Sequence, residues 1–393
     1  MTTSIALDVI LAVALLSYIG YGFRAGFTRS IATILGIVLG AVAAFFLMPL
    51  VGSWVPQPIL RIIVTVVLGI GLVAAGQVLG ATVGKAIRRA LAHSPLGAID
   101  RVIGGVTMGI VAALVASMIA FSVGALGVPL LSQAISGSVV LRTIDTLTPD
   151  PVQALLARLR AAVVQDGLPH IAEALGVGNP GVPKVDTGTP SLTTAAQSVV
   201  RITGNAFECG QSQSGSGFVI ADDRVVTNAH VVAGVGEPVV EAPGKGALSG
   251  VVVYFDPVDD LAIIAVDGLN APPLVLSPAL SRDSVGAVQG YPFGGPFISN
   301  PAQVISVATI GVPDIYGTST SQREVYTIAA DVEPGNSGGP LLSQDGTVAG
   351  VVFAKGTTEN DIGYAMTNTE LAPVIAEAES LTGSVSSGAC TRG

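Results

Sequence analysis

Four apolar runs in the first third of the chain most strongly limit what it can fold into. They cover about residues 5–23, 30–48, 59–81 and 102–126, and each is close to the roughly 20 residues that an apolar helix needs to cross a bilayer. No small-residue cleavage site follows the first run, so it is not a signal peptide alone. Only 11% of all residues are charged, against about 25% in soluble chains. We therefore predict a four-helix transmembrane domain over residues 1–126.

The connections between the runs predict the orientation of this domain. Six basic residues lie in the first and third connections: Arg24, Arg29, Lys85, Arg88, Arg89 and Arg101. The second connection, residues 49–58, contains no Lys or Arg. Because cytoplasmic loops are enriched in Lys and Arg, we expect both basic connections in the cytoplasm. Four crossings then make this a multi-pass protein of the plasma membrane and place residues beyond about 127 on the extracytoplasmic (periplasmic) side.

Glycines inside the runs recur at spacings that allow helices to approach closely: Gly36, Gly40, Gly69, Gly71, Gly76, Gly80, Gly105 and Gly109. Two motifs also stand out, Gly22-Phe-Arg-Ala-Gly26-Phe and Leu96-Gly-Ala-Ile-Asp100-Arg101-Val-Ile-Gly104-Gly105. With these motifs, about residues 5–126 resemble the colicin V production protein family of small four-helix membrane proteins. The resemblance implies an anchor or sensor and indicates no chemistry.

Residues 127–190 are predicted to be a linker. Apolar residues recur at helical spacing between Pro149 and Gly176, which predicts an amphipathic juxtamembrane helix. Residues 177–190 are rich in Gly and Pro and predict a flexible spacer.

The C-terminal part, residues 191–393, differs from the rest in charge and in pattern. It contains 7 Lys/Arg and 20 Asp/Glu, whereas residues 1–190 contain 11 and 7, so it has no electrostatic attraction to nucleic acid or to an anionic membrane surface. Ten short runs, mostly rich in β-branched residues, alternate with turn residues: 199–203, 217–220, 224–227, 250–255, 261–266, 284–289, 303–310, 325–329, 340–342 and 348–353. One helix is expected near residues 371–381. The pattern predicts an all-β barrel or sandwich.

A candidate nucleophile lies in Gly335-Asn336-Ser337-Gly338-Gly339-Pro340. Glycines on both sides of a serine suit a tight turn that exposes the hydroxyl. The backbone N–H groups of Gly335 and Ser337 can then point at a developing oxyanion. A plain glycine-rich hairpin turn is the alternative.

A candidate general base and acid accompany this serine. His230, in Thr227-Asn-Ala-His230-Val-Val, is the single histidine of residues 191–393, so Ser–His chemistry in this domain requires it. Asp260 directly precedes an apolar run and can be buried against the imidazole, fixing its tautomer. Asp256 and Asp259 compete for the same role.

The order His230, Asp260, Ser337 looks like the trypsin-like fold. Local motifs over about residues 195–380 are similar to its bacterial envelope-protease branch: Ser214-Gly-Ser-Gly-Phe-Val219, Asp260-Leu-Ala262 and Asp361-Ile-Gly-Tyr-Ala-Met366. The resemblance implies a chymotrypsin/trypsin-like double β-barrel and a serine endopeptidase, and it selects Asp260 as the third member of the triad. It also implies that Gly363 lies in the wall of the specificity pocket.

Some positions depart from or extend that pattern. Asn336 replaces the Asp of digestive enzymes, so activation through an ion pair with a freed N-terminus is not expected. Few residues follow the last expected element, so no PDZ domain is expected. Asp331 lies six residues before Ser337, where the trypsin-like pattern places the base of the specificity pocket. An acid there favours Arg or Lys before the cleaved bond, unless Asp331 faces solvent.

The combination of both halves resembles the acid-resistance periplasmic serine proteases of mycobacteria and related actinobacteria. That resemblance implies processing of cell-envelope proteins and survival of acid and oxidative stress. Cys209 and Cys390 are the only cysteines of the chain, and both fall in the half expected outside the cytoplasm, where disulfides persist. We therefore expect them to form a disulfide, as a structural staple or as a redox switch, with two free thiols as the alternative.

Two other functions remain to be weighed against the protease. One alternative is a transporter or channel with the β domain as a regulatory plug, but the spans lack charged or polar lining. A catalytically inactive binding module is the third possibility, and the intact His, Asp and Ser motifs argue against it. With one His and two distant Cys, the β domain has no metal-ligand cluster, so no metal or cofactor is expected. Partners are protein or peptide substrates, and the residues do not specify an oligomeric state.

Overall fold

The structure is a computed structural model that describes residues 2–53, 58–91, 97–124, 128–161, 169–171, 181–206, 211–357 and 361–391. It divides into two compact units. One consists of Ile5–Ser117, and the other consists mainly of Met118–Gly393. The first is helical, and the second is rich in β-strands.

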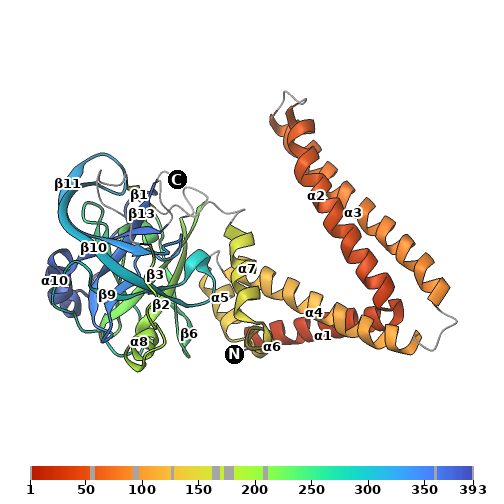
Figure 1. Cartoon of the computed structure of the whole chain (residues 1–393), viewed down its shortest axis with the longest axis horizontal. Coiled ribbons are helices and arrows are strands. Elements are labelled where there is room, and N and C mark those ends of the chain that lie inside the picture. Colours follow the sequence, from red (N-terminus) through yellow and green to blue (C-terminus); the bar gives the residue numbers. More distant parts are fainter. Residues whose placement is uncertain are drawn as a thin grey trace. The chain divides into compact units, whose positions relative to one another are not determined.

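Four long helices form the first unit (Figure 1): α1 (Thr2–Ala25), α2 (Phe27–Ser53), α3 (Pro58–Leu91) and α4 (Gly97–Gly124). All four are long and apolar enough to cross a membrane, which confirms the four predicted apolar helices. Lys85, Arg88 and Arg89, expected in a loop, lie instead on the last turns of α3. The helix continues past the apolar run because Ala, Lys and Arg favour helix and no Pro interrupts them.

Helices α2 and α3 lie side by side (Figure 1), and small residues set their spacing. A Cβ atom added at Gly36 would collide with the carbonyl oxygen of Gly76, and one at Gly76 would collide with that of Gly36. Gly80 meets the carbonyl oxygen of Ala32 in the same way. The expected close packing through glycine is therefore confirmed for this pair of helices.

The colicin-V-like motif residues meet around Asp100. Its Oδ1 accepts hydrogen bonds from the Thr28 N–H at 2.9 Å and the Thr28 hydroxyl at 2.8 Å, and its Oδ2 lies 3.6 Å from Arg88 Nε. Gly26 has a φ of +77°, and a side chain there would collide with the Asp100 carboxylate. The glycine thus makes room for a carboxylate that joins α2, α3 and α4.

Three short helices precede the β-rich domain: α5 (Pro129–Ser136), α6 (Val139–Leu147) and α7 (Asp150–Ala161). Helix α7 begins where the amphipathic helix was predicted, and the later part of that prediction falls largely outside the described residues. Helices α5 and α6 were not predicted. Residues 181–189 contain no regular structure, in keeping with their Gly and Pro content.

Two seven-stranded sheets build the rest of the second unit. The first has the order β6-β5-β2-β3-β4-β8-β7, with β2 (Val199–Ala206), β3 (Gln211–Ala221), β4 (Arg224–Thr227), β5 (Val239–Ala242), β6 (Gly246–Ser249), β7 (Val251–Asp256) and β8 (Leu261–Ala265). The second has the order β1-β13-β12-β9-β10-β11-β14, with β1 (His170–Ile171), β9 (Val285–Gly290), β10 (Ile298–Pro313), β11 (Thr320–Ala330), β12 (Pro340–Ser343), β13 (Val348–Gly356) and β14 (Ile362–Thr367).

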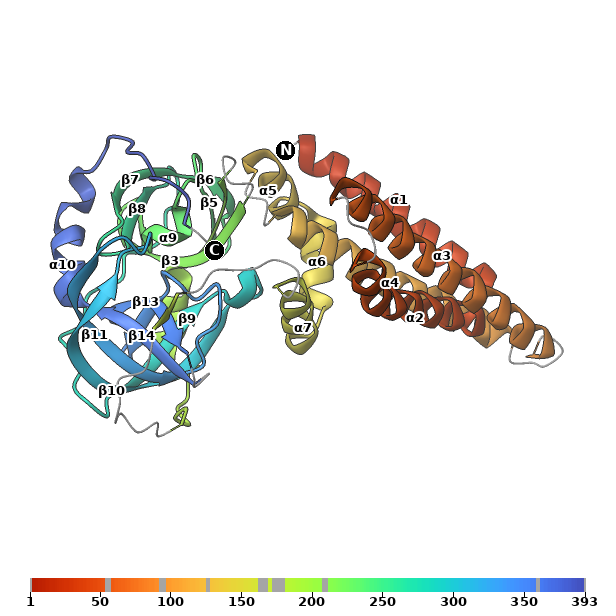
Figure 2. The same cartoon turned by 90° about the horizontal axis from the view of Figure 1, so that it is seen from above.

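Both sheets curl, as Figure 2 shows, and an additional pairing of β13 with β14 closes the second one. Each encloses apolar side chains, and a third cluster joins the two. That joining cluster includes Val199 and Phe218 from the first sheet and Ile305 and Phe353 from the second. The predicted β-barrel architecture is therefore confirmed.

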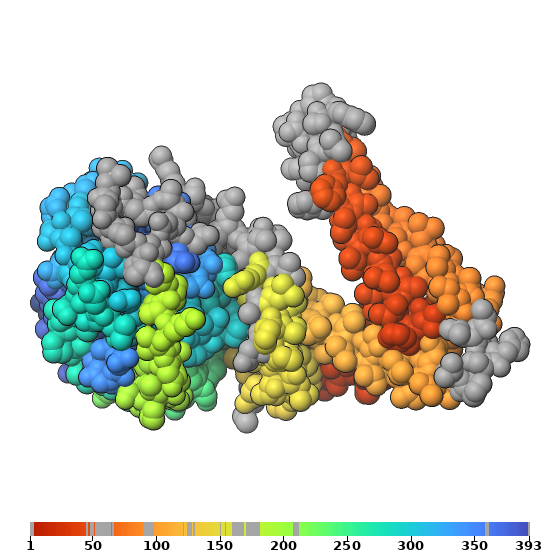
Figure 3. Space-filling model, viewed as in Figure 1, coloured from red at the N-terminus to blue at the C-terminus, as the bar shows by residue number. Residues whose placement is uncertain are grey.

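Every one of the ten predicted runs lies on or overlaps a strand, whereas β5, β6 and β1 were missed. Strand β1 lies within the segment predicted to be the juxtamembrane helix, and it is extended there because it pairs with β13. Helix α10 (Asn368–Glu377) is the predicted C-terminal helix. Helix α8 (Pro190–Ala195) belongs to a segment, yellow-green in Figure 3, that runs over the surface of the β-rich domain. The Leu192 side chain is buried there, and Gln289 donates a hydrogen bond to its carbonyl oxygen.

Strands β10 and β11 are longer than predicted because their turn is held by one carboxylate. Asp314 accepts hydrogen bonds from the backbone and hydroxyl of Thr318 and of Ser319, and from the Tyr316 N–H. The side-chain bond from Thr318 is the first of the causes that hold the pKa of Asp314 well below its usual value. The Ile315 N–H reaches across to the carbonyl oxygen of Pro257 at 3.1 Å.

Candidate active site

The turn around Ser337 has the sharp geometry that its glycines suggest. Gly335 and Gly338 have φ angles of +95° and +81°, in the left-handed region that favours glycine. A side chain at Gly338 would collide with Thr227 Oγ1. Ser337 itself is 3% exposed. The turn that carries Ser337 therefore packs against the end of β4, close to the segment that carries His230.

Asn336 closes this turn through its side chain. The Glu333 N–H donates to Asn336 Oδ1 at 2.9 Å, and the Asn336 N–H donates to the Glu333 carbonyl oxygen at the same distance. Asn336, which replaces the Asp of digestive enzymes, thus stabilises the turn through these two hydrogen bonds.

The candidate oxyanion donors are the N–H groups of Gly335 and Ser337. The next N–H groups along the chain already donate hydrogen bonds. The Gly338 N–H donates to the Val352 carbonyl oxygen, and the Gly339 N–H donates to the Asn336 carbonyl oxygen. Among the backbone hydrogen bonds of the described residues, none has the N–H of Gly335 or Ser337 as its donor. Both donors are thus available for an incoming oxygen.

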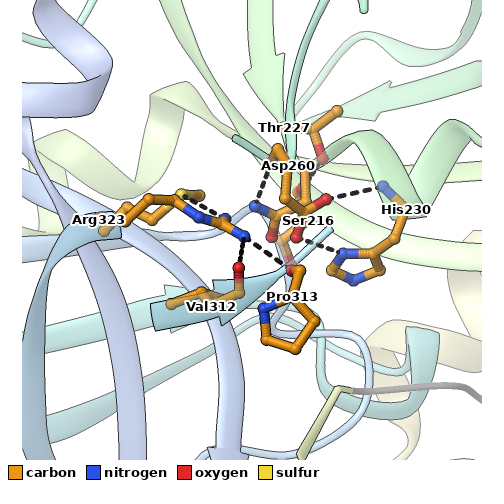
Figure 4. Close-up of polar contacts among 9 residues, drawn as sticks. Ser216, Thr227, His230, Asp260, Val312, Pro313 and Arg323 are labelled. Carbon is orange, nitrogen blue, oxygen red and sulfur yellow. Dashed lines mark hydrogen bonds and ion pairs between the residues drawn. The ribbon is translucent and has the colours of Figure 1, made fainter. Parts of the chain in front are cut away.

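His230 and Asp260 form a buried pair (Figure 4). His230 lies on the short helix α9 (Ala229–Val232) and is 7% exposed, and Asp260 is 3% exposed. The His230 ring Nδ1 lies 2.8 Å from Asp260 Oδ2, and the His230 backbone N–H donates to Asp260 Oδ1 at 2.9 Å. One carboxylate thus holds both the ring and the backbone of His230, which leaves Nε2 as the nitrogen that can act as a base.

The local backbone explains why Asp260 is the acid that reaches the histidine. Asp260 has a φ of +54°, a conformation in which Asp is several-fold enriched among non-glycine residues. Asn228 Nδ2 donates to its carbonyl oxygen at 2.9 Å. Asp256 instead accepts from the N–H groups of Val258 and Asp259 and so forms the preceding turn.

Asp259, the other competitor, is half-buried at the outside of the same turn. Burial, and then the charges of Asp256 and Glu370, raise its pKa. Of the three candidate acids, the hydrogen bonds of the described residues connect only Asp260 to His230.

Ser337 and His230 come from different barrels, and backbone contacts bring them together. The Ser216 N–H donates to the Ser337 carbonyl oxygen at 2.8 Å. A Cβ atom at Gly338 would lie 3.0 Å from the Asn228 nitrogen, two residues before His230. No hydrogen bond joins the two side chains among those of the described residues. Such bonds are often long without substrate and tighten when it binds.

Two hydroxyl groups that the sequence analysis did not single out support the nucleophile turn. Ser216 Oγ donates to the Gly335 carbonyl oxygen at 2.6 Å and accepts from the Tyr291 N–H at 2.9 Å. Thr227 Oγ1 donates to the Ser216 carbonyl oxygen at 2.7 Å. Both side chains are fully buried. Both residues lie in motifs that the sequence already shows: Ser216 in the motif of the first hairpin, and Thr227 in the motif that contains His230.

The expected specificity residues are both neighbours of Val332, Asp331 in sequence and Gly363 in space. Asp331 is half-buried, and its carbonyl oxygen accepts from Asn300 Nδ2. Gly363 lies on β14, where an added Cβ atom would be 2.5 Å from Val332 Cγ2, so that its lack of a side chain makes room for the core of the second barrel. The pocket roles of Asp331 and Gly363 stay predictions.

Lys355, near the end of β13, makes two contacts close to the loop that leads to Ser337. Lys355 Nζ lies 3.5 Å from Glu333 Oε2, in the loop that leads to Ser337. The Lys355 N–H donates to the Pro169 carbonyl oxygen at 3.1 Å, where β1 pairs in parallel with β13. A short part of the linker thus lies along this strand.

The C-terminal tail lies along the first barrel. The Gly234 N–H donates to the Ser387 carbonyl oxygen, and the Ser387 hydroxyl donates to that of Val235. The Cys390 sulfur lies beside Gly234. Cys209 lies outside the described residues, so the pairing of Cys209 with Cys390 stays a prediction.

Comparison with known proteins agrees with both halves of the fold. The family model for colicin V production protein matches residues 7–149, and the one for the trypsin-like peptidase domain matches residues 215–351. The serine protease Rv3671c of Mycobacterium tuberculosis is 37% identical over 401 residues, which cover 99% of this chain and 100% of the relative. The putative serine protease HhoA of Synechocystis is 28% identical over 63% of this chain and 64% of its own length.

A solved structure matches the β-rich part in three dimensions. The crystal structure of the Rv3671c protease from M. tuberculosis in its active form has a TM-score of 0.53 and 39% sequence identity to this chain. The match covers 57% of this chain and 100% of that one.

Proposed function

The chain belongs to the family of the serine protease Rv3671c of M. tuberculosis, and we propose that His230, Asp260 and Ser337 are its catalytic triad. It is a serine endopeptidase, and four apolar helices anchor it in the membrane. The observation that carries the triad assignment is the buried His230–Asp260 pair, with ring Nδ1 2.8 Å from the carboxylate.

In this mechanism Ser337 Oγ attacks the carbonyl carbon of the scissile peptide bond while His230 Nε2 takes the hydroxyl proton. Asp260 holds the ring tautomer and stabilises the imidazolium. The N–H groups of Gly335 and Ser337 bind the oxyanion. His230 then gives its proton to the leaving amine, which departs and leaves an acyl-enzyme. Water, deprotonated by His230, releases the acyl group and restores Ser337.

The membrane arrangement is also part of the proposal. Residues 1–126 form the transmembrane domain, residues 127–190 the linker and residues 191–393 the protease domain. Basic residues near the ends of α1 and α3 support a cytoplasmic position for those ends, which places the protease domain on the extracytoplasmic side. Its substrates would then be proteins of the cell envelope, with a role in resistance to acid and oxidative stress. Digestion of the domain by external protease in spheroplasts tests the orientation.

A fluorophosphonate label tests the triad without knowledge of the substrate, because it reacts with a serine that a neighbouring base activates. We expect the full chain in detergent to be labelled, and the Ser337→Ala and His230→Ala variants to remain unlabelled. Equal labelling of the His230→Ala variant and the unchanged protein would exclude the proposed base.

Specificity is a separate part of this proposal. An acid at position 331 would favour Arg or Lys before the cleaved bond, and Gly363 would form part of the pocket wall. A peptide-library profile should lose its preference for basic residues in the Asp331→Ser variant. An unchanged profile would assign Asp331 to the surface.

A further inference from the structure

Arg323, on β11, is the largest fully buried side chain among the residues that the structure describes, with 1% exposure. Its Nη2 donates to the carbonyl oxygens of Pro313 at 2.8 Å and Val312 at 3.4 Å. Its Nε donates to Ser321 Oγ at 3.2 Å. The guanidinium carbon also lies 5.8 Å from the centre of the Phe353 ring. Neutral groups thus surround this cation.

A cation buried among neutral groups is costly unless other charges compensate it. No ion pair within 4.0 Å involves Arg323 among those of the described residues. Burial lowers the pKa of Arg323, and the charges of Asp260, Asp259, Glu370 and Asp256 oppose that effect, with Asp260 the strongest of them. The compensation therefore comes mainly from the turn that carries the triad acid.

The positive charge of Arg323 lies on the side of Asp260 away from His230 (Figure 4). In Figure 4 the Arg323 side chain reaches from β11 toward Asp260, and His230 lies on the other side of Asp260. Backbone contacts fix the two segments together, because the strand end that Arg323 holds continues to Ile315, whose N–H donates to the Pro257 carbonyl oxygen.

We propose that Arg323 is a positioning residue of the active site, whose buried positive charge acts through Asp260 to oppose protonation of His230 and so favours transfer of the Ser337 proton to its ring. The inference rests on the proposed triad. Carboxylates near an imidazole favour its protonated form, and a cation opposes them.

The groups that face this arrangement are mostly acidic. Asp260 contacts His230 directly. Asp256 and Asp259 lie in the same turn, and Glu370 comes from α10. Glu324, the neighbour of Arg323 on β11, accepts hydrogen bonds from Thr367 and Thr369. Arg323 is the cation that offsets these acids.

Inactivation by diisopropyl fluorophosphate measures the activated serine, so its second-order rate constant can be followed in the full chain in detergent from about pH 4 to about pH 9. We expect the midpoint of the acidic limb to rise by about half to one pH unit in Arg323→Met, less than the roughly 1–3 units that a charge in direct contact gives, because Arg323 makes none of the ion pairs within 4.0 Å among the described residues. Arg323→Lys, which keeps the charge, should return the midpoint toward that of the unchanged protein.

Arg224→Met is the matched control. Arg224 also donates to carbonyl oxygens, those of Ala378 at 3.1 Å and Leu381 at 3.0 Å, but it lies on β4 at the opposite end from His230. Its loss should leave the midpoint in place. Glu370→Gln should move the midpoint the other way, to lower pH, and as a change at a partly exposed helix residue it keeps the test possible if Arg323→Met does not fold.

Each outcome decides between the alternatives. A rate that falls equally at every pH, with an unmoved midpoint in Arg323→Met and Glu370→Gln, would assign Arg323 to packing alone. Equal shifts in Arg323→Met and Arg323→Lys would also reject the role of its charge. If the unchanged protein is not labelled at Ser337, the proposed triad itself fails, which is a different result from an unmoved midpoint.

Discussion

Replacing Asp260 with Asn separates the charge of this residue from its place in the fold. Asn tolerates the left-handed conformation nearly as well as Asp, so the φ of +54° and the hydrogen bond from Asn228 to the carbonyl oxygen can persist. The amide oxygen can still accept one of the two hydrogen bonds from His230. The amide NH₂ group, however, cannot accept the other, and it favours the ring tautomer whose Nε2 carries the proton.

The size of the expected loss follows from the two hydrogen bonds of 2.8 and 2.9 Å between His230 and Asp260. Hydrogen bonds to a charged group contribute about 1.5–3 kcal/mol each. One bond is lost and the other no longer has a charged acceptor. Together with the lost stabilisation of the imidazolium, this raises the barrier by about 3–6 kcal/mol, or about 10²- to 10⁴-fold in rate. The same change in the trypsin-like template lowers kcat by about 10⁴-fold, at the upper end of that range.

Asp259→Asn is the matched control, because Asp259 is adjacent in sequence and half-buried, and the hydrogen bonds of the described residues connect His230 to Asp260 and not to Asp259. Initial rates with a fluorogenic peptide should fall at least about 100-fold in Asp260→Asn and change less than about twofold in Asp259→Asn. Thermal denaturation should show that both variants are folded. Equal losses in the two variants, or near-normal turnover in Asp260→Asn, would refute the assignment of Asp260.

Three further predictions concern catalysis, stability and the tail. Ser337→Ala and His230→Ala should each lower peptide hydrolysis by about 10⁴-fold or more, and the double variant should be no worse, since triad members act as a unit; additive losses would contradict this. Because the pKa of folded Asp314 is depressed, its stabilisation should be complete above about pH 4 and fade as the pH falls further. Asp314→Asn should therefore lower Tm at neutral pH and match the unchanged protein in strong acid, and a constant Tm difference would argue otherwise. Thiol counting under denaturing conditions without reductant should find Cys209 and Cys390 linked, whereas two free thiols would refute the bond.

The parts of the fold that could be predicted from sequence are those that local pattern determines. Apolar runs of the right length gave the four membrane helices, and β-branched runs between turns gave ten strands. Strand β6, Gly246–Ser249, contains no β-branched residue, and its existence depends on pairing with β5, which in turn pairs with β2. Tertiary pairing overrides weak local preference in such segments.

The same division applies to the active site. Motifs identified His230, Asp260 and the Ser337 turn because each carries its chemistry in a short stretch of sequence. Ser216 and Arg323 were missed because their roles come from partners far along the chain. Ser216 reaches the Gly335 carbonyl oxygen across 119 positions, and a single arginine in a strand shows no sign in the sequence of being buried.

These long-range contacts indicate where the active site is assembled. His230 and Asp260 belong to the first barrel and Ser337 to the second, so neither barrel contains the complete proposed triad. Connections across the interface include the apolar cluster that joins the barrels, the Ser216 hydroxyl and N–H, which hold the nucleophile turn, and the strand end bound by Arg323, which contacts the turn before Asp260. A small relative shift of the barrels would leave the His230–Asp260 pair intact and move Ser337 away from it. Catalytic competence in this domain therefore depends on the contact between the barrels as much as on the triad residues themselves.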